Sequence, residues 1–149
     1  MSATAEVAEV KAPYTLRRQV LGVTLIELMV VVAIIAIIGA VAFPSYQTSI
    51  RKGRRADASD AATGVLQAQE RWRANNATYT ASLASLNQSA TTINGYYTQA
   101  LSATSGTGYT LTITPVASKG QNSDTGCTSL VVAVSNGNPV YTPATCWSR

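Results

Sequence analysis

The chain has 149 residues, of which 46% are hydrophobic and only 12% are charged, and its formal net charge is +4. This length leaves room for one modest folded core beside a membrane segment and for no second domain. The charge is too small to identify a partner. The sequence has no histidine and only 7 acidic residues, which disfavours a metal site or acid–base catalysis.

An apolar run from Val23 to Phe43 follows a short leader, residues 1–22. At about 1.5 Å per residue in a helix, this run is long enough to cross a hydrocarbon core of about 30 Å, so we expect a transmembrane helix. Glu27 lies near its start, where an ionised side chain costs about 2.5 to 3.5 kcal/mol unless a positive charge offsets it. A cut after Gly22 would supply that charge, because the new amine of Val23 would lie one helical turn from Glu27.

The order of these features resembles a type IV prepilin: a basic leader that ends in Gly22, the sequence Val-Thr-Leu-Ile-Glu-Leu-Met, an apolar helix, and Pro44 at its far end. The resemblance implies that a prepilin peptidase cuts between Gly22 and Val23 on the cytoplasmic side. It also implies that Val23 is N-methylated and that Glu27 acts in assembly and subunit register. Most members have Phe or Met at the position of Val23, and this difference bears on methylation more than on cleavage.

A simpler interpretation of the apolar run is a signal anchor that tolerates Glu27 near the interface. A secretory signal, however, places its cleavage site after a shorter apolar region. Cations lie on both sides of the run, so the positive-inside rule does not fix its orientation. Cys127 and Cys146 favour an oxidising compartment. We therefore expect the leader in the cytoplasm and the rest of the chain in the periplasm or outside the cell.

The fold that the resemblance implies is α+β: a long N-terminal helix, half transmembrane and half amphipathic, packed on a small antiparallel sheet. Gly39 and Pro44 are expected to kink or break the helix before it resumes. From Ala56 onwards an apolar stripe should pack on the sheet, and Asn75 and Asn76 should end the helix. The stripe consists of Ala58, Ala61, Ala62, Val65, Leu66 and Trp72. The expected divisions are residues 1–22 (cleaved leader), 23–55 (assembly helix and its extension) and 56–149 (head).

Four later segments are rich in β-branched and aromatic residues and should form the sheet. They are Tyr96–Ala103, Tyr109–Val116, Leu130–Val134 and Val140–Thr142, with residues 104–108 as a hairpin loop between the first two. Tyr109, Leu111 and Ile113 alternate with threonines, so this apolar set should face the helix. Pro115, Pro139 and Pro143 should mark strand ends.

Cys127 and Cys146 bracket the last two expected strands. Closing a loop of roughly 20 residues would contribute about 3 kcal/mol in the loop-entropy model. In pilins such a C-terminal disulfide loop borders the surface-exposed recognition region, and the resemblance extends that role to this chain. The simpler interpretation is that the bond only stabilises the sheet.

Few other residues suggest chemistry. Asp57 and Asp60 are expected to complement the dipole of a helix that starts near them. Arg51, Lys52, Arg54 and Arg55 form the one basic group that could bind lipid headgroups, DNA or acidic neighbours. A solvated or membrane-proximal stretch is the simpler interpretation, because no aromatic residues lie between these cations. We expect no enzyme activity, no cofactor and no metal.

We interpret the chain as a structural subunit of a type IV pilus, most like a minor pilin of the PilE type that is incorporated into the filament or primes it. Its expected partners are other pilin subunits through the N-terminal helix, the prepilin peptidase and the inner-membrane assembly platform. It would lie in the inner membrane of a Gram-negative bacterium before assembly and in the surface pilus afterwards. Twitching motility, adhesion and DNA uptake are the activities to distinguish. The alternatives are a major pilin, a type II secretion pseudopilin, or a membrane-anchored binding module of a different class.

Overall fold

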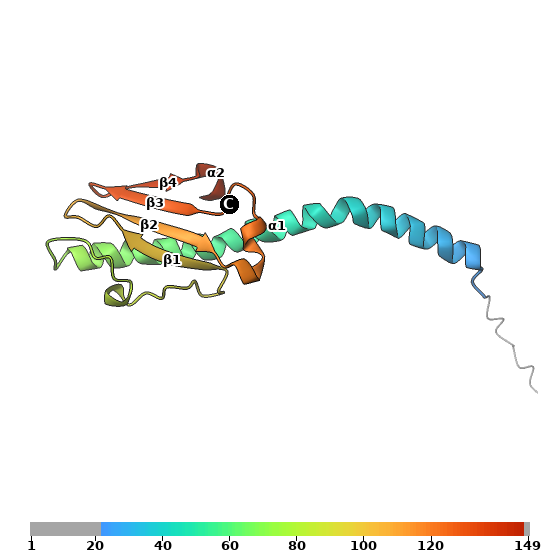
Figure 1. Ribbon diagram of the computed structural model, residues 1–149, viewed down its shortest axis with the longest axis horizontal. Coiled ribbons are helices and arrows are strands. Elements are labelled where there is room, and N and C mark those ends of the chain that lie inside the picture. Colours follow the sequence, from blue (N-terminus) through green and yellow to red (C-terminus); the bar gives the residue numbers. More distant parts are fainter. Residues whose placement is uncertain (1–21, 148–149) are drawn as a thin grey trace, which may run out of the picture. The chain divides into compact units, whose positions relative to one another are not determined.

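The computed structural model describes residues 22–147. The leader before Gly22 and the last two residues lie outside the described residues. Residues 22–38 belong to one compact unit and residues 39–147 to a second. Helix α1, Leu25–Arg73, runs through both units (Figure 1).

The first part of α1, up to Phe43, has the composition of a membrane span. It includes a stretch that is long and apolar enough to cross a membrane, and none of that stretch is buried. Pro44 lies inside α1, so the expectation of a break there is wrong. A proline removes one backbone hydrogen bond, and the ladder continues on either side of it. The kink at Gly39 and Pro44 stays a prediction.

The second part of α1 presents the expected apolar stripe to the sheet. Ala58, Ala62 and Val65 are buried, and the other members of the stripe are half-buried. The buried face also contains Asp57 and Gln69, which the pattern of apolar residues did not include. Small alanine side chains allow the helix to lie close to the strands. The helix ends at Arg73, within a few residues of the expected stop.

The strands form one antiparallel sheet in the order β1-β2-β3-β4, and it lies against the second part of α1 (Figure 1). The strands are β1 (Tyr97–Ser102), β2 (Gly108–Pro115), β3 (Leu130–Ser135) and β4 (Asn138–Thr142). Each lies within one or two residues of its expected bounds. The α+β architecture of a long helix on a small antiparallel sheet is therefore confirmed.

The core lies between α1 and the inner face of this sheet. Tyr109, Leu111 and Ile113 are all buried, as the alternation predicted. Leu111 pairs with Leu101 on β1 and with Val132 on β3, which places the three strands in register at the centre of the core. Every residue of β4 is exposed, and this strand is an edge of the sheet, where the missing amide hydrogen of a proline does least harm.

Short turns connect the regular elements. Between α1 and β1 lies η1 (Ala84–Leu86), and between β2 and β3 lie η2 (Ala117–Lys119) and η3 (Gln121–Ser123). The chain ends in a four-residue helix, α2 (Ala144–Trp147), after β4. The sequence did not predict these elements, because three or four residues are too few to show a periodic pattern.

Candidate functional site

The expected processing site lies just ahead of α1. Gly22 and Val23 are exposed and non-helical, and Thr24 caps the helix. The amide of Glu27 donates a hydrogen bond to Thr24 Oγ1 at 3.2 Å, and the amide of Leu28 donates to the Thr24 carbonyl at 3.2 Å. This is half of a capping box, a Thr followed three residues later by Glu. Glu27 thus lies in the first turn of the helix, where a carboxylate interacts favourably with the helix dipole.

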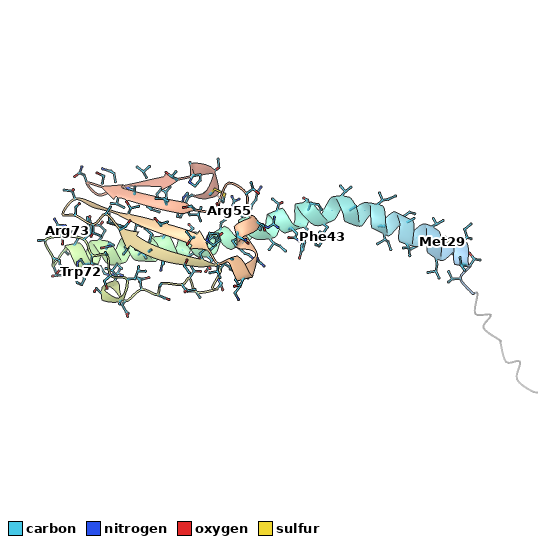
Figure 2. The ribbon with its side chains drawn as sticks, in the orientation of Figure 1. Met29, Phe43, Arg55, Trp72 and Arg73 are labelled. Atoms are coloured by element: carbon cyan, nitrogen blue, oxygen red, sulfur yellow. A yellow bond between two sulfur atoms is a disulfide. The ribbon has the colours of Figure 1, made fainter. Side chains whose placement is uncertain are left out.

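The Glu27 side chain is exposed, and within the described residues its carboxylate makes no hydrogen bond or ion pair. The apolar side chains that follow it are exposed as well. Met29 and Phe43 stand out from α1 in Figure 2 and are 64% and 63% exposed. Apolar surface of this extent is covered by lipid or by other protein chains. The segment can therefore anchor the chain and contact other helices.

The basic group divides into three environments. Arg54 donates to the Lys119 carbonyl at 3.1 Å, and its guanidinium lies 4.5 Å from the centre of the Tyr96 ring. Arg51 donates to the Gln47 side chain at 3.0 Å, whereas Lys52 is exposed. The head binds Arg54 in this way and also binds Arg55. The four residues therefore do not form one continuous basic patch.

Arg55, the fourth cation, joins α1 to the loop before the disulfide. Its Nε donates to Asp124 Oδ2 at 2.7 Å, and its Nη2 donates to Asp124 Oδ1 at 2.8 Å. The hydrogen bond that Arg55 donates to Asp124 raises the pKa of Arg55 above its ordinary value. Gln121, which is fully buried, donates to Asp124 Oδ2 and to the Arg51 carbonyl, both at 3.1 Å. Arg55 and Asp124 lie 69 residues apart, and no local pattern in the sequence indicates that they pair.

The expectation for Asp57 is wrong, because α1 is continuous and no helix starts near this residue. Asp57 is instead buried and accepts hydrogen bonds from the Thr92 hydroxyl and from the amide and side chain of Asn94. These bonds fasten the segment between η1 and β1 to the helix. Asp60 is exposed on the next turn of α1.

Cys127 and Cys146 form a disulfide, and both residues are buried. The bond closes a segment that contains β3 and β4 and ends in α2. The amide of Cys127 donates to the Asp124 carbonyl at 2.9 Å, so the disulfide lies directly beside the Arg55–Asp124 pair. The disulfide thus joins α2 to the loop before β3, and the ion pair joins that loop to α1.

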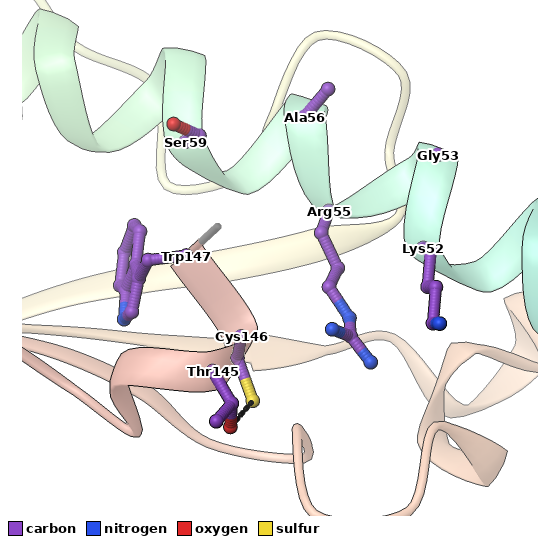
Figure 3. A pocket seen from close by; sticks show the side chains of 8 residues that line it. All are labelled: Lys52, Gly53, Arg55, Ala56, Ser59, Thr145, Cys146 and Trp147. Carbon is purple, nitrogen blue, oxygen red and sulfur yellow. Dashed lines mark hydrogen bonds between the residues drawn. The ribbon is translucent and has the colours of Figure 1, made fainter. Parts of the chain in front are cut away.

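A pocket of about 450 Å³ lies between α1 and α2, next to the disulfide (Figure 3). We call it the Trp147 pocket. Its lining residues are Lys52, Gly53, Arg55, Ala56, Ser59, Thr145, Cys146 and Trp147. Lys52 was predicted only as part of the basic group, and nothing in the sequence indicates that α1 and Trp147 meet.

Two buried tyrosines lie in the core of the head. Burial raises the pKa of Tyr97 to about 12 and raises the pKa of Tyr109 still further. Both phenols are therefore protonated at neutral pH. Among the described residues, no group of three or more His, Cys, Asp or Glu side chains could hold a metal ion.

Comparison with known families gives two matches that adjoin in the chain. Residues 17–43 match the prokaryotic N-terminal methylation motif. Residues 44–131, more than half of the chain, match the family described as type IV minor pilin ComP, DNA uptake sequence receptor. Together the matches cover the apolar part of α1, the rest of that helix, and the head as far as β3.

A curated relative agrees with these matches. The chain is 32% identical over 93 residues to the fimbrial protein EcpC of Eikenella corrodens, and the alignment covers 62% of this chain and 61% of the relative. The chain thus spans about three fifths of the length of that relative. A capped N-terminal helix with an exposed apolar half, an antiparallel head and both family matches lead to one conclusion: the chain belongs to the type IV minor pilin family.

Proposed function

We propose that this minor pilin is made as a precursor, is cut between Gly22 and Val23, and enters a type IV pilus in which its head binds DNA for uptake. The observation that carries the proposal is the family match over residues 44–131, whose description names a DNA uptake sequence receptor. The pilus belongs to a Gram-negative cell, and the protein waits in the inner membrane before assembly.

Membership in the pilin family implies association with other pilus subunits and with the machinery that processes prepilins. The exposed apolar side chains of the first part of α1 support this, because they would be covered by lipid before assembly and by neighbouring helices afterwards. The methylation motif supports a prepilin peptidase and methylation of Val23. The matched families are structural pilins, and we propose that the chain has no enzymatic activity.

Glu27 would set the position of each subunit along the filament. An unpaired carboxylate in an apolar helix bundle is costly, whereas a matched ion pair is tolerated and favours one axial offset. The new amine of Val23 on a neighbouring subunit is a suitable partner. The helix cap at Thr24 supports this role because it keeps the residues before Leu25 out of the helix, with Val23 exposed.

DNA binding is supported by the charge of the head. The described residues from 44 to 147 carry seven Lys or Arg side chains and four Asp or Glu side chains. One of these acids, Asp124, is already paired with Arg55. A moderate excess of cations suits contacts with phosphates, with an affinity that falls as the salt concentration rises.

Three measurements test the proposal. Filaments sheared from native cells should contain, as a minor component, a peptide that begins with methylated Val23, as detected by mass spectrometry. The full-length protein in detergent micelles should bind double-stranded DNA, and cells that lack the protein should take up less DNA.

An intact leader in the membrane fraction, with no filament peptide, would instead indicate a plain anchored domain. Dominance of the peptide over all other subunits would indicate a major pilin, and a cut chain absent from filaments a pseudopilin.

A further inference from the structure

The Trp147 pocket has the charge of an anion site. No acidic side chain lines it. Arg55 is already held by Asp124, but Lys52 is exposed and makes no hydrogen bond or ion pair within the described part of the chain. The hydroxyl of Ser59, on the same side of α1, is half-buried and likewise donates no hydrogen bond to another described residue. An exposed, unpaired cation among the described residues and a hydroxyl group thus border the same cavity.

The other end of the pocket is aromatic. Trp147 Nε1 donates to the Thr142 carbonyl at 3.4 Å, and its ring meets the Tyr141 ring edge-on at 5.1 Å between centroids. These contacts hold the indole in place. Figure 3 shows Trp147 at one end of the pocket and Lys52 at the other, with Ala56 and Ser59 on the helix beside them.

Small residues of α1 keep the space between Trp147 and Lys52 open. Gly53 and Ala56 lie on this stretch of the helix, and a Cβ added at Gly53 would meet nothing within 4 Å. The volume of about 450 Å³ falls within the usual range for a small-molecule site and suits a planar ring.

We propose that the Trp147 pocket binds one unpaired nucleotide of DNA, with the base against the indole of Trp147 and the phosphate at Lys52 Nζ. Stacking on an aromatic side chain together with a cation on the backbone is the usual way in which proteins hold unpaired bases. This inference rests on the proposed DNA binding and adds a specific site to it. The nucleotide comes either from single-stranded DNA or from an unpaired position in a duplex.

The first test is a set of affinities for the full-length protein in detergent micelles. Fluorescence anisotropy would be measured with a labelled 12-nucleotide single strand, the matched blunt duplex, and the same duplex with one unpaired base. Lys52→Gln removes the cation, and Ala56→Leu fills the space between the ring and the cation with a good helix former. Lys119→Gln is the matched control, because it removes one exposed cation of the head that does not line the pocket.

We expect Lys52→Gln and Ala56→Leu each to weaken binding of the single strand by about fivefold or more, and Lys119→Gln by less than about twofold. Thermal unfolding followed by circular dichroism would verify that Ala56→Leu is folded. Equal losses for the two lysine variants, with Ala56→Leu unchanged, would overturn the site and leave the proposed DNA binding intact. If the unmodified protein bound none of the three DNA molecules, both proposals would be overturned.

A spectroscopic readout reports on the base directly. The chain has two tryptophans, so Trp72→Phe leaves Trp147 as the only indole. Stacking of a base should quench the fluorescence of Trp147 when the single strand is added. Ala56→Leu should abolish this quenching. The duplex with one unpaired base should quench if that position supplies the nucleotide. Equal quenching by the blunt duplex, or none by any DNA, would overturn the unpaired-nucleotide site.

Discussion

Arg55 on α1 holds both carboxylate oxygens of Asp124, three residues ahead of Cys127, at 2.7 and 2.8 Å. Asp124 is only 5% exposed, so removal of Arg55 would leave a nearly buried carboxylate without a counter-ion. We expect Arg55→Ala to lower the free energy of unfolding by about 3 kcal/mol. Asp124→Asn should cost less, because an amide carries no charge.

Urea unfolding followed by circular dichroism would measure these changes. Lys52→Ala is the control, since this lysine lies on the same stretch of α1 but is exposed. It should change stability by no more than about 0.5 kcal/mol. Equal stabilities of Arg55→Ala and the unmodified protein would show that the ion pair is structurally unimportant.

The bounds of α1 and of the strands could be predicted from the sequence because they depend on local periodicity. Leu111 and Ile113 alternate with threonines, and Ala58, Ala62 and Val65 recur at helical spacing. The cap at Thr24 and the exposed apolar run also depend on residues that are near each other in the chain.

The junction between α1 and the loops depends on long-range contacts, and these were not predictable. Arg55 and Asp124 are 69 residues apart, and Asp57 and Thr92 are 35 apart. A carboxylate such as Asp57 looks like a solvated charge when only its neighbours in the chain are known. The Trp147 pocket could not be predicted for the same reason, since its two walls, on α1 and α2, lie far apart in the sequence.

Gly108 at the start of β2 tests how closely the strands approach. A Cβ at this position would lie 2.2 Å from the Val134 carbonyl oxygen, a distance that requires the backbone to shift. We expect Gly108→Ala to destabilise the head by about 1 to 3 kcal/mol. Gly106→Ala is the control, because its Cβ would meet its nearest atom at 3.5 Å. Similar melting temperatures for both variants would contradict this explanation.

The tyrosines of the core predict a loss of stability in alkaline solution. The pKa of Tyr97 is raised to about 12 in the folded head, against about 10 in an unfolded chain. Between these values the folded state retains a proton that the unfolded state loses, so stability falls as pH rises from about 10 to about 12. The decline should reach about 2 kcal/mol from this residue.

Tyr97→Phe separates this effect from other alkaline changes. The Tyr97 hydroxyl is buried without a hydrogen bond within normal distance in the described structure, so the variant should differ little in stability at about pH 7. Its decline above about pH 10 should be smaller than that of the unmodified head, with a remainder from Tyr109, whose pKa is also raised. Parallel declines for the two proteins would refute the assignment.

The disulfide between Cys127 and Cys146 should contribute about 3 kcal/mol to the head, because it closes a loop of roughly 20 residues in the unfolded chain. Reduction or a double Cys→Ser variant should therefore lower the melting temperature without preventing membrane insertion, which depends on α1. The double variant should not respond to a reductant. An unchanged melting temperature on reduction of the unmodified protein would contradict the stabilising role.

The position of Glu27 in the first turn of α1 allows two roles to be separated. Its amide is capped by Thr24, and glutamine is as acceptable as glutamate at this position of a capping box. Because the cap uses the Glu27 amide, Glu27→Gln and Glu27→Ala both retain it and remove the charge, whereas Thr24→Ala removes the cap alone. If an ion pair with the amine of Val23 on a neighbour sets the register, both Glu27 variants should be cut normally after Gly22 but incorporated into filaments at least about tenfold less, while Thr24→Ala should be incorporated nearly normally. Mass spectrometry of the membrane and filament fractions would measure cutting and incorporation separately. Normal incorporation of Glu27→Gln with poor incorporation of Thr24→Ala would show instead that the helix cap, and not the charge, is what assembly requires.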